Sequence, residues 1–257
     1  MRFLVIVPVL FIIACSHNRY DVDVSNVKVN VNIKRLDKTL ALIKNDSIEQ
    51  HIPSLVNEFG SFIELYSTQI IKIGSVNNAR YADNLKSFLA YDVFDDITSL
   101  IYKTFGKDSL SFQPELTDAF RHYEYYFPNK KIPSIYTFNG GFNQSIVIDS
   151  SLIGIGLDKY LGNDCYLYKQ LGLELFKRKE MYPGKIVPDC IYALAESEFP
   201  YSFANENLLS TMIHEGRKIY FIKCMIPDIN DTVLWGFSSK QLEFCINNEN
   251  HMWNFLV

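Results

Sequence analysis

The sequence predicts an α+β protein that is predominantly helical, with a small antiparallel sheet packed by helices. Apolar residues recur at helical spacing over residues 36–103 and again beyond residue 186, and short β-rich runs separated by turn residues occupy residues 134–157. The chain has 257 residues, of which 48% are hydrophobic and 14% aromatic, so it can bury a sizeable core. We expect residues 27–257 to form a single globular domain.

The charge balance argues against one class of partner. Lys and Arg total 25 and Asp and Glu total 29, which gives a net charge of −4, and the sequence contains no basic block. Proteins that bind nucleic acid neutralise its phosphates with clustered Lys and Arg. We therefore expect no nucleic-acid partner.

The first fifteen residues indicate export and lipidation. Arg2 precedes an apolar run from Phe3 to Ala14, which is too short to span a bilayer and has the length of a signal-peptide core. The run ends in Ala14-Cys15, which resembles the bacterial lipobox, in which the cysteine is acylated and becomes the mature N-terminus. An ordinary secretory peptide with a chance cysteine is the alternative.

The lipobox predicts three segments and a compartment. We expect a signal peptide over residues 1–14, a lipidated Cys15 that binds the membrane, and a polar tether over residues 15–26. Ser16, rather than Asp, follows the cysteine and favours the outer membrane of a Gram-negative envelope, with the protein facing the periplasm.

The elements of the N-terminal half follow from periodicity. Val27, Val29, Val31 and Ile33 alternate with polar residues and predict an opening strand. Residues 36–103 predict a helical layer, with Gly60, Gly74 and Gly106 where helix C-termini favour a left-handed residue. Residues 116–127 predict a further helix that ends before Pro128.

The second half predicts the sheet and three more helices. Residues 134–138, 144–149 and 152–157 are β-rich runs separated by turns at residues 139–141 and 149–151, a pattern typical of an antiparallel meander. We expect helices over about residues 187–198, 206–225 and 240–256.

The helix over residues 206–225 carries the main candidate site. Zinc hydrolases use His-Glu-x-x-His on a helix, because two imidazoles four residues apart converge on one metal and the Glu accepts a proton from bound water. Here His214 and Glu215 are followed by Lys218 at the second ligand position, and an ammonium does not coordinate zinc. We expect no catalytic site, with His214 as a weak zinc ligand candidate and His214 and Glu215 as catalytic relics. The structural alternative places His214 near the core, pairs Glu215 with a neighbouring base and packs Gly216 closely against another element.

Weaker candidates lie in the sheet region. Asp158 and Asp164 flank a Gly-containing turn and suit either a divalent cation or a helix cap and turn. Residues 139–143 offer backbone donors to an anion, or simply form a hairpin turn. The cysteines besides Cys15 show no CxxC spacing, which argues against a cysteine zinc site and leaves buried thiols and disulfides both open: Cys165, Cys190, Cys224 and Cys245.

Several stretches, taken in order, resemble the GldB family of Bacteroidetes gliding-motility lipoproteins. The most specific is the GLDKYLG string within residues 153–162. The others are residues 31–37 (VNIKRLD), 120–128 (FRHYEYYFP), 212–221 (MIHEGRKIYF), and the block from LEFC at 242–245 to MW at 252–253. The resemblance runs from the lipobox to Val257 and so covers nearly the whole chain.

The resemblance implies a zincin-like scaffold with a decayed metal site, residence in the cell envelope and a role in gliding motility through other envelope or motility proteins. Family members usually continue past the Trp block, so we expect a truncated C-terminus whose last helix lacks a packing partner. An apolar surface left bare there would bind a partner or aggregate.

Three functional hypotheses follow. The leading one is a non-catalytic, lipid-anchored envelope protein that acts through protein contacts. The alternative is a zinc-dependent peptidase-like hydrolase in which His214 binds the metal and Glu215 is the base. A solute-binding lipoprotein that uses its many aromatic residues is the third.

Overall fold

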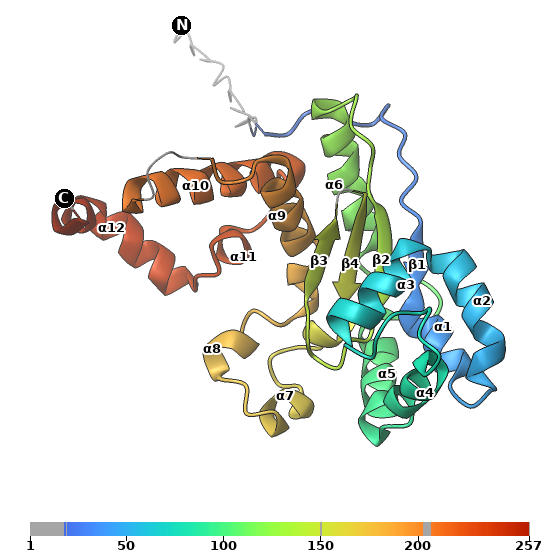
Figure 1. Cartoon of the computed structure of the whole chain (residues 1–257). Coiled ribbons are helices and arrows are strands. Elements are labelled where there is room, and N and C mark those ends of the chain that lie inside the picture. The colour runs from blue at the N-terminus through green and yellow to red at the C-terminus, as the bar shows by residue number, and fades with distance from the viewer. Residues whose placement is uncertain (1–17, 19, 150, 203–206, 257) are drawn as a thin grey trace, which may run out of the picture.

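The computed structural model describes residues 18, 20–149, 151–202 and 207–256, and it shows a central sheet covered by helices on both faces (Figure 1). Helix α3 lies in front of the strands and α6 behind them in that view. The prediction of a predominantly helical α+β fold with a small sheet is therefore confirmed.

The N-terminal half forms the helical layer that the periodicity predicts. Each helix buries one apolar stripe, as Leu55 and Phe59 illustrate in α2. The elements are α1 (Leu36–Ile43), α2 (Ile48–Phe59), α3 (Ser61–Leu65), the π-helical turn η1 (Tyr66–Ile70), α4 (Tyr81–Leu89), α5 (Asp92–Phe105) and α6 (Gln113–Tyr126).

The sheet is mixed, so the prediction of an antiparallel sheet is wrong. Its strands are β1 (Ile33–Arg35), β2 (Ser134–Phe138), β3 (Ile146–Asp149) and β4 (Leu152–Gly156), in the spatial order β1-β2-β4-β3. Only β3 and β4 pair antiparallel, as the predicted turn after Asp149 requires. Strand β2 pairs parallel with both β1 and β4.

Burial explains why β4 rather than β3 lies beside β2. Every residue of β4 is buried, whereas β3 is half-buried and ends in the exposed Asp149. A strand covered on both faces reads as a continuous apolar run and suits a parallel, interior position. In an antiparallel meander, strands adjacent in sequence pair in order. Here the more deeply buried β4 lies between β2 and β3.

Two apolar clusters cover the two faces of the sheet. Ile135, Ile153 and Ile155 face the cluster formed with α5, α6, α9 and α10. Tyr136 and Phe138 face the cluster formed with α1 to α4. Gly154 lies on this second face, where a Cβ would approach the Phe62 ring to 2.7 Å. The alternation of side chains along each strand thus divides one sheet between two cores.

The C-terminal half is helical and extends to one side of the sheet (Figure 1). An Asn207–Ser210 capping box starts α10, which lies against α9 and α6. The elements are η2 (Leu157–Lys159), α7 (Tyr166–Gln170), α8 (Leu175–Arg178), η3 (Pro183–Lys185), α9 (Ile186–Glu198), α10 (Leu208–Met225), α11 (Asp231–Trp235) and α12 (Ser239–Leu256), which is kinked at Asn248. Across the described residues, no helix combines the length and apolarity needed to cross a bilayer.

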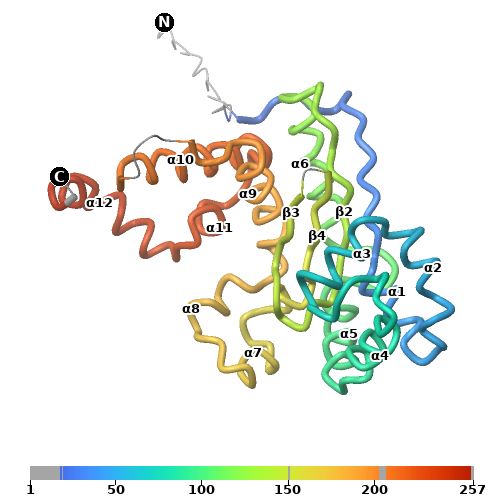
Figure 2. The backbone as a smooth tube through the Cα atoms, in the orientation of Figure 1, coloured from blue at the N-terminus to red at the C-terminus, as the bar shows by residue number. Residues whose placement is uncertain are grey.

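The N-terminal segment is extended, but most of it is not a strand. Val27, Val29 and Val31 are at least half-buried and their neighbours are exposed, as the alternation predicts. Ladder pairing begins only at Ile33, so the predicted strand is shorter than expected. In Figure 2 this segment starts near α10 and passes above the strands before it descends to β1.

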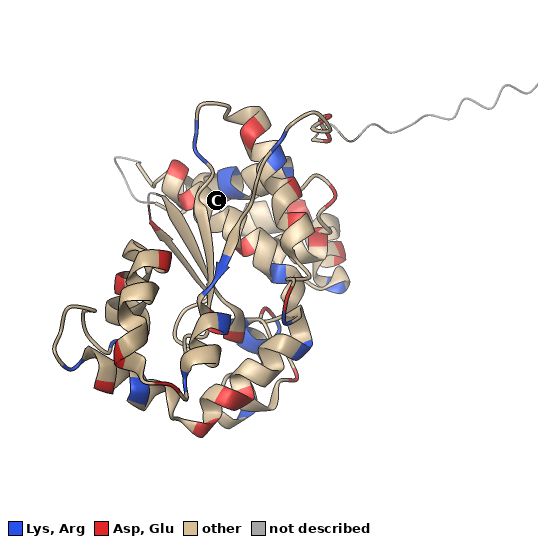
Figure 3. Cartoon of the chain, turned by 90° about the vertical axis from the view of Figure 1, so that its right-hand side faces the viewer, with Lys and Arg blue, Asp and Glu red and all other residues tan. Residues whose placement is uncertain are grey.

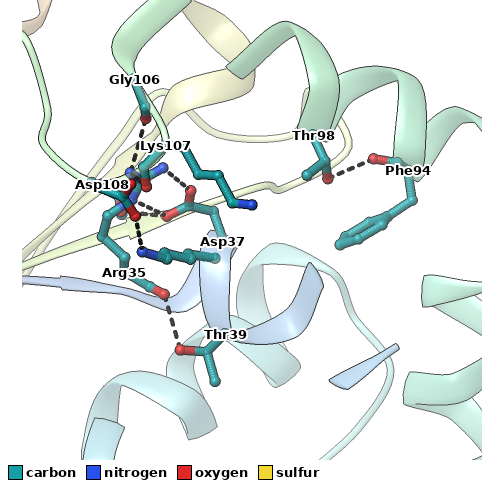
Figure 4. Close-up of polar contacts among 10 residues, drawn as sticks. Arg35, Asp37, Thr39, Phe94, Thr98, Gly106, Lys107 and Asp108 are labelled. Atoms are coloured by element: carbon teal, nitrogen blue, oxygen red, sulfur yellow. Dashed lines mark hydrogen bonds and ion pairs between the residues drawn. The ribbon is translucent and has the colours of Figure 1, made fainter. Parts of the chain in front are cut away.

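A buried ion pair fixes the start of α1 (Figure 4). Arg35 Nη2 lies 2.6 Å from Asp37 Oδ2, and Asp37 Oδ1 accepts a 2.5 Å hydrogen bond from the Thr137 hydroxyl in β2. Arg35 Nη1 also donates to the carbonyls of Gly106 (3.0 Å) and Lys107 (2.8 Å) after α5. Gly106 has φ of 96°, a conformation that glycine adopts without strain. One pair therefore links β1, β2 and the end of α5.

We predict that Asp37→Asn destabilises the protein by about 3 kcal/mol, because the side chains of Arg35 and Asp37 are 10% and 2% exposed and the change leaves a buried cation without its counter-charge. Urea unfolding would measure the loss. Asp108→Asn is the control: Asp108 pairs with Lys38 at 2.8 Å but is 85% exposed, so no measurable loss is expected. Equal losses in the two variants would contradict the role given to Asp37.

Candidate functional site

The candidate site lies where α10 packs against α9. Glu215 and Lys218, three residues apart on α10, face Tyr192 and Glu196, four residues apart on α9. Lys218 Nζ lies 2.7 Å from Glu215 Oε1 and 2.6 Å from the Tyr192 hydroxyl, and it also pairs with Glu196 Oε1. The Lys218 side chain is only 2% exposed. Its ammonium is enclosed by oxygen atoms.

All three donors of the Lys218 ammonium have an acceptor. A lysine ammonium has three N–H groups, and Glu196, Glu215 and Tyr192 each accept one. Glu215 is equally occupied, because its Oε2 accepts a 2.9 Å hydrogen bond from the Tyr192 hydroxyl. The cluster is thus a closed network of one cation, two carboxylates and a phenol.

The network keeps both ionised groups charged. Burial disfavours the charged form of Lys218, but its hydrogen bonds to Glu196, Glu215 and Tyr192 outweigh this effect and raise the pKa of Lys218 above its ordinary value. Burial opposes ionisation of Glu215 as well, and the hydrogen bonds from Lys218 and Tyr192 overcome it and lower the pKa of Glu215. A carboxylate with a lowered pKa is a weak base, so the arrangement suits structural pairing better than proton abstraction.

His214 is buried beside this network but is not part of its hydrogen bonding. Its Nε2 lies 3.9 Å from Glu196 Oε1, beyond hydrogen-bond distance, and its ring meets Tyr201 edge-on at 5.2 Å between centroids. The structure therefore places His214 near the core and pairs Glu215 with a base, as the structural interpretation of the sequence predicts.

His214 and Glu215 line different cavities. His214 lines a groove of about 1050 Å³ on one side of α10, whereas Glu215 and Tyr192 line a cavity of about 570 Å³ on the other side. In the zinc hydrolase motif both side chains act on one metal-bound water. Here Lys218 pairs with Glu215 and with Glu196, the residue that His214 approaches. Among the described residues, no three His, Cys, Asp or Glu side chains gather in positions suited to a metal ion.

The prediction of close packing at Gly216 is wrong. A Cβ at this position would meet nothing within 4 Å, and Gly216 lines the open groove with His214. Glycine in a helix is therefore not evidence of a tight contact here, because the residue lies on the solvent side of α10.

The structure unites two weaker candidates into one buried cluster. The Asp158 carboxylate is fully buried and accepts hydrogen bonds from the backbone N–H groups of Gly140 (3.3 Å) and Phe142. The predicted anion-binding loop thus binds an anion supplied by the chain itself. Burial raises the pKa of Asp158 to about 6, although the hydrogen bonds from Phe142 and Gly140 act in the opposite direction.

The other weak candidates lie apart from this cluster. The Asp164 side chain is 89% exposed and lies 3.7 Å from Lys169 Nζ, so it does not share a buried site with Asp158. Within the described residues the cysteines form no disulfide, which decides the alternative that the sequence left open: Cys165, Cys190, Cys224 and Cys245. The lipidation candidate Cys15 lies outside the described residues.

Sequence reasoning missed the partners on α9. Tyr192 and Glu196 complete the Lys218 network, and their four-residue spacing places them on one helix face. That spacing could have identified a polar stripe, but not which helix it faces. The sequence around Arg35 and Asp37 likewise did not indicate their contact with Thr137, which is 100 residues away from Asp37.

We predict a pH-dependent difference between the protein and its Asp158→Asn variant. Folding raises the pKa of Asp158 from 3.8 to about 6, so its stabilising contribution is fully present below about pH 4 and is lost as pH rises through about 6. On lowering the pH from 7 to 4, the free energy of unfolding should rise by about 2 kcal/mol relative to the variant.

Urea unfolding at several pH values would measure this difference. The exposed Asp164 provides the matched control, because Asp164→Asn should follow the unmodified protein across the same range. A constant offset between the protein and Asp158→Asn would contradict the raised pKa.

Comparison with known proteins agrees with the motif resemblance. The family model described as gliding motility protein GldB matches residues 17–257. No curated protein and no solved structure matches the chain. The family match includes all the described residues and both helices of the Lys218 network. The chain therefore belongs to the GldB family of gliding motility proteins.

Proposed function

We propose that the protein is a non-catalytic cell-envelope protein of the gliding-motility lipoprotein family, held on the outer membrane by acyl groups on Cys15, facing the periplasm and acting through protein contacts. The observation that carries the non-catalytic role is Lys218, whose ammonium occupies the second ligand position of a His-Glu-x-x-His motif and is enclosed by Glu196, Glu215 and Tyr192.

The position of Lys218 supports descent from a metal site. His214 and Lys218 are four residues apart on one helix face, and both approach Glu196 Oε1. A cation that replaces a metal ion would neutralise the same carboxylates without offering a Lewis acid or a bound water. The zincin-like scaffold implied by the family resemblance is part of this proposal.

Exposed apolar side chains support a role in protein contacts. Phe244, Ile246 and Phe255 on α12 are 62%, 76% and 90% exposed. Three large apolar side chains left exposed on one helix are available for contact with a partner. On the side of the molecule seen in Figure 3, acidic and basic residues are interspersed over the helices, so that surface has mixed charge.

A second function has one specific observation in its favour. The 3.9 Å separation between His214 Nε2 and Glu196 Oε1 brings an imidazole and a carboxylate together, as in a zinc hydrolase site with Glu215 as the base. This alternative requires Lys218 to leave its acceptors, which its raised pKa and burial oppose.

We predict that Lys218→His creates a zinc site that the unmodified protein lacks. The substitution would place two imidazoles four residues apart and would leave the Glu196 carboxylate available as a third ligand. Isothermal titration with zinc and metal analysis of the purified chains would measure binding. Lys218→Met, which removes the ammonium without adding a ligand, should not bind zinc.

The same titration tests the hydrolase alternative. Stoichiometric zinc in the unmodified protein, lost in His214→Ala, would overturn the non-catalytic proposal. Failure of Lys218→His to bind zinc, with its fold intact by circular dichroism, would remove the argument for a relic metal site.

We predict that the chain incorporates labelled palmitate in its native host and that Cys15→Ser abolishes incorporation, because the acyl groups are attached to this cysteine. Cys165→Ser is the matched control and should retain the label. Density-gradient separation of the two membranes would locate the labelled protein. Label on the Cys15→Ser chain, or labelled protein in the inner membrane, would contradict the proposed anchoring.

A further inference from the structure

The groove along α10 is apolar and large. Its volume of about 1050 Å³ is at the upper end of the range of about 300–1,000 Å³ for ligand cavities. Phe127, Phe199 and Phe221 line it as a ring cluster, with centroid separations of 5.7 to 6.3 Å. Ile213 adds an aliphatic side chain that is 43% exposed, and Gly216 leaves part of the wall open.

The N-terminal segment enters the molecule at this groove. Tyr20 lines it and packs edge-on against Tyr220, with ring centroids 5.7 Å apart. Asn18 Nδ2 donates a 3.0 Å hydrogen bond to the carbonyl of Pro227, just beyond the end of α10. Cys15 precedes Tyr20 by five residues, and five residues extend to about 18 Å at most. The chain length alone therefore allows an acyl group on Cys15 to reach the groove.

We propose that the groove binds an acyl chain attached to this protein's own Cys15. This inference rests on the lipidation advanced under the proposed function. Three observations favour this occupant: Asn18 and Tyr20 are fixed beside the groove, Cys15 is only a few residues away in the sequence, and the lining is largely aromatic and aliphatic. Glu198, Ser202, His214 and Arg217 also line the groove and supply polar groups that orient a ligand beside the apolar lining.

The proposal gives the groove two states. When the acyl chain lies in the groove, it is shielded from water. When the acyl chain lies in the bilayer, the groove is open to other ligands. One acyl chain cannot do both, so filling the groove should strengthen membrane binding. A larger residue at position 216 would fill the groove, because a Cβ there meets no atom within 4 Å.

Binding of fluorescent palmitate tests the proposal on two forms of the chain from residue 15 onward: the acylated protein from its host and the Cys15→Ser form. The Cys15→Ser form should bind one palmitate saturably, and the acylated form at least about tenfold more weakly, because its groove is already filled. A mass spectrum of the mature N-terminus is recorded first, so absence of lipidation is detected separately and would overturn both proposals.

Groove variants of the Cys15→Ser form locate the binding. Gly216→Leu fills the groove and Ile213→Asp places a charge in it, so each should weaken palmitate binding about tenfold or more. Met212→Asp is the matched control, since Met212 is similarly exposed and adjacent on α10 but does not line the groove. It should bind palmitate as the parent does.

Vesicles of phosphatidylethanolamine and phosphatidylglycerol provide the second readout. Acylated Gly216→Leu should bind them more tightly than the acylated parent, because its acyl chain can no longer enter the groove. Equal palmitate binding by the acylated and Cys15→Ser forms would overturn the proposal and indicate that the groove takes lipid from another source. Unchanged binding in both groove variants would overturn it as well.

Discussion

The two-sided burial of the central sheet is the constraint on which the rest of the structure depends. Strands β2 and β4 divide their side chains between two apolar clusters, one with α1 to α4 and one with α5, α6, α9 and α10. Neither strand has a face for solvent, so both faces must be covered before the sheet is stable. The position of α9, and of α10 upon it, follows from this requirement.

Two buried carboxylates at the edges of the sheet accept hydrogen bonds from distant segments. Asp37 pairs with Arg35 and Thr137, and Asp158 accepts backbone N–H groups from the loop after β2. Such groups cost free energy if left alone, which makes them specific for one arrangement of the chain. They tie the loops to the sheet.

The Lys218 network follows the same rule at the α9–α10 contact. A single ammonium satisfies two carboxylates and a phenol, and the mutual hydrogen bonds lower the pKa of Glu215 and raise the pKa of Lys218. Each donor of the Lys218 ammonium is therefore engaged by an acceptor. The open groove on the other side of α10 is chemically different, since six of its lining residues are Phe or Tyr. One helix therefore presents a closed polar face and an open apolar one.

The sequence by itself determined the longer helices from α6 onward and the family. Helical periodicity located α6, α9 and α10 within a few residues, because the burial of one helix face is a local pattern. The sequence also identified Lys218 as the residue four positions after His214, because this spacing is local. Strand order, the partners Tyr192 and Glu196, and the union of Asp158 with the loop after β2 were decided only by the tertiary structure. Each of these contacts joins segments that are far apart in the sequence, and no local periodicity indicates which segments meet. The burial of side chains in the folded protein decides which segments pair.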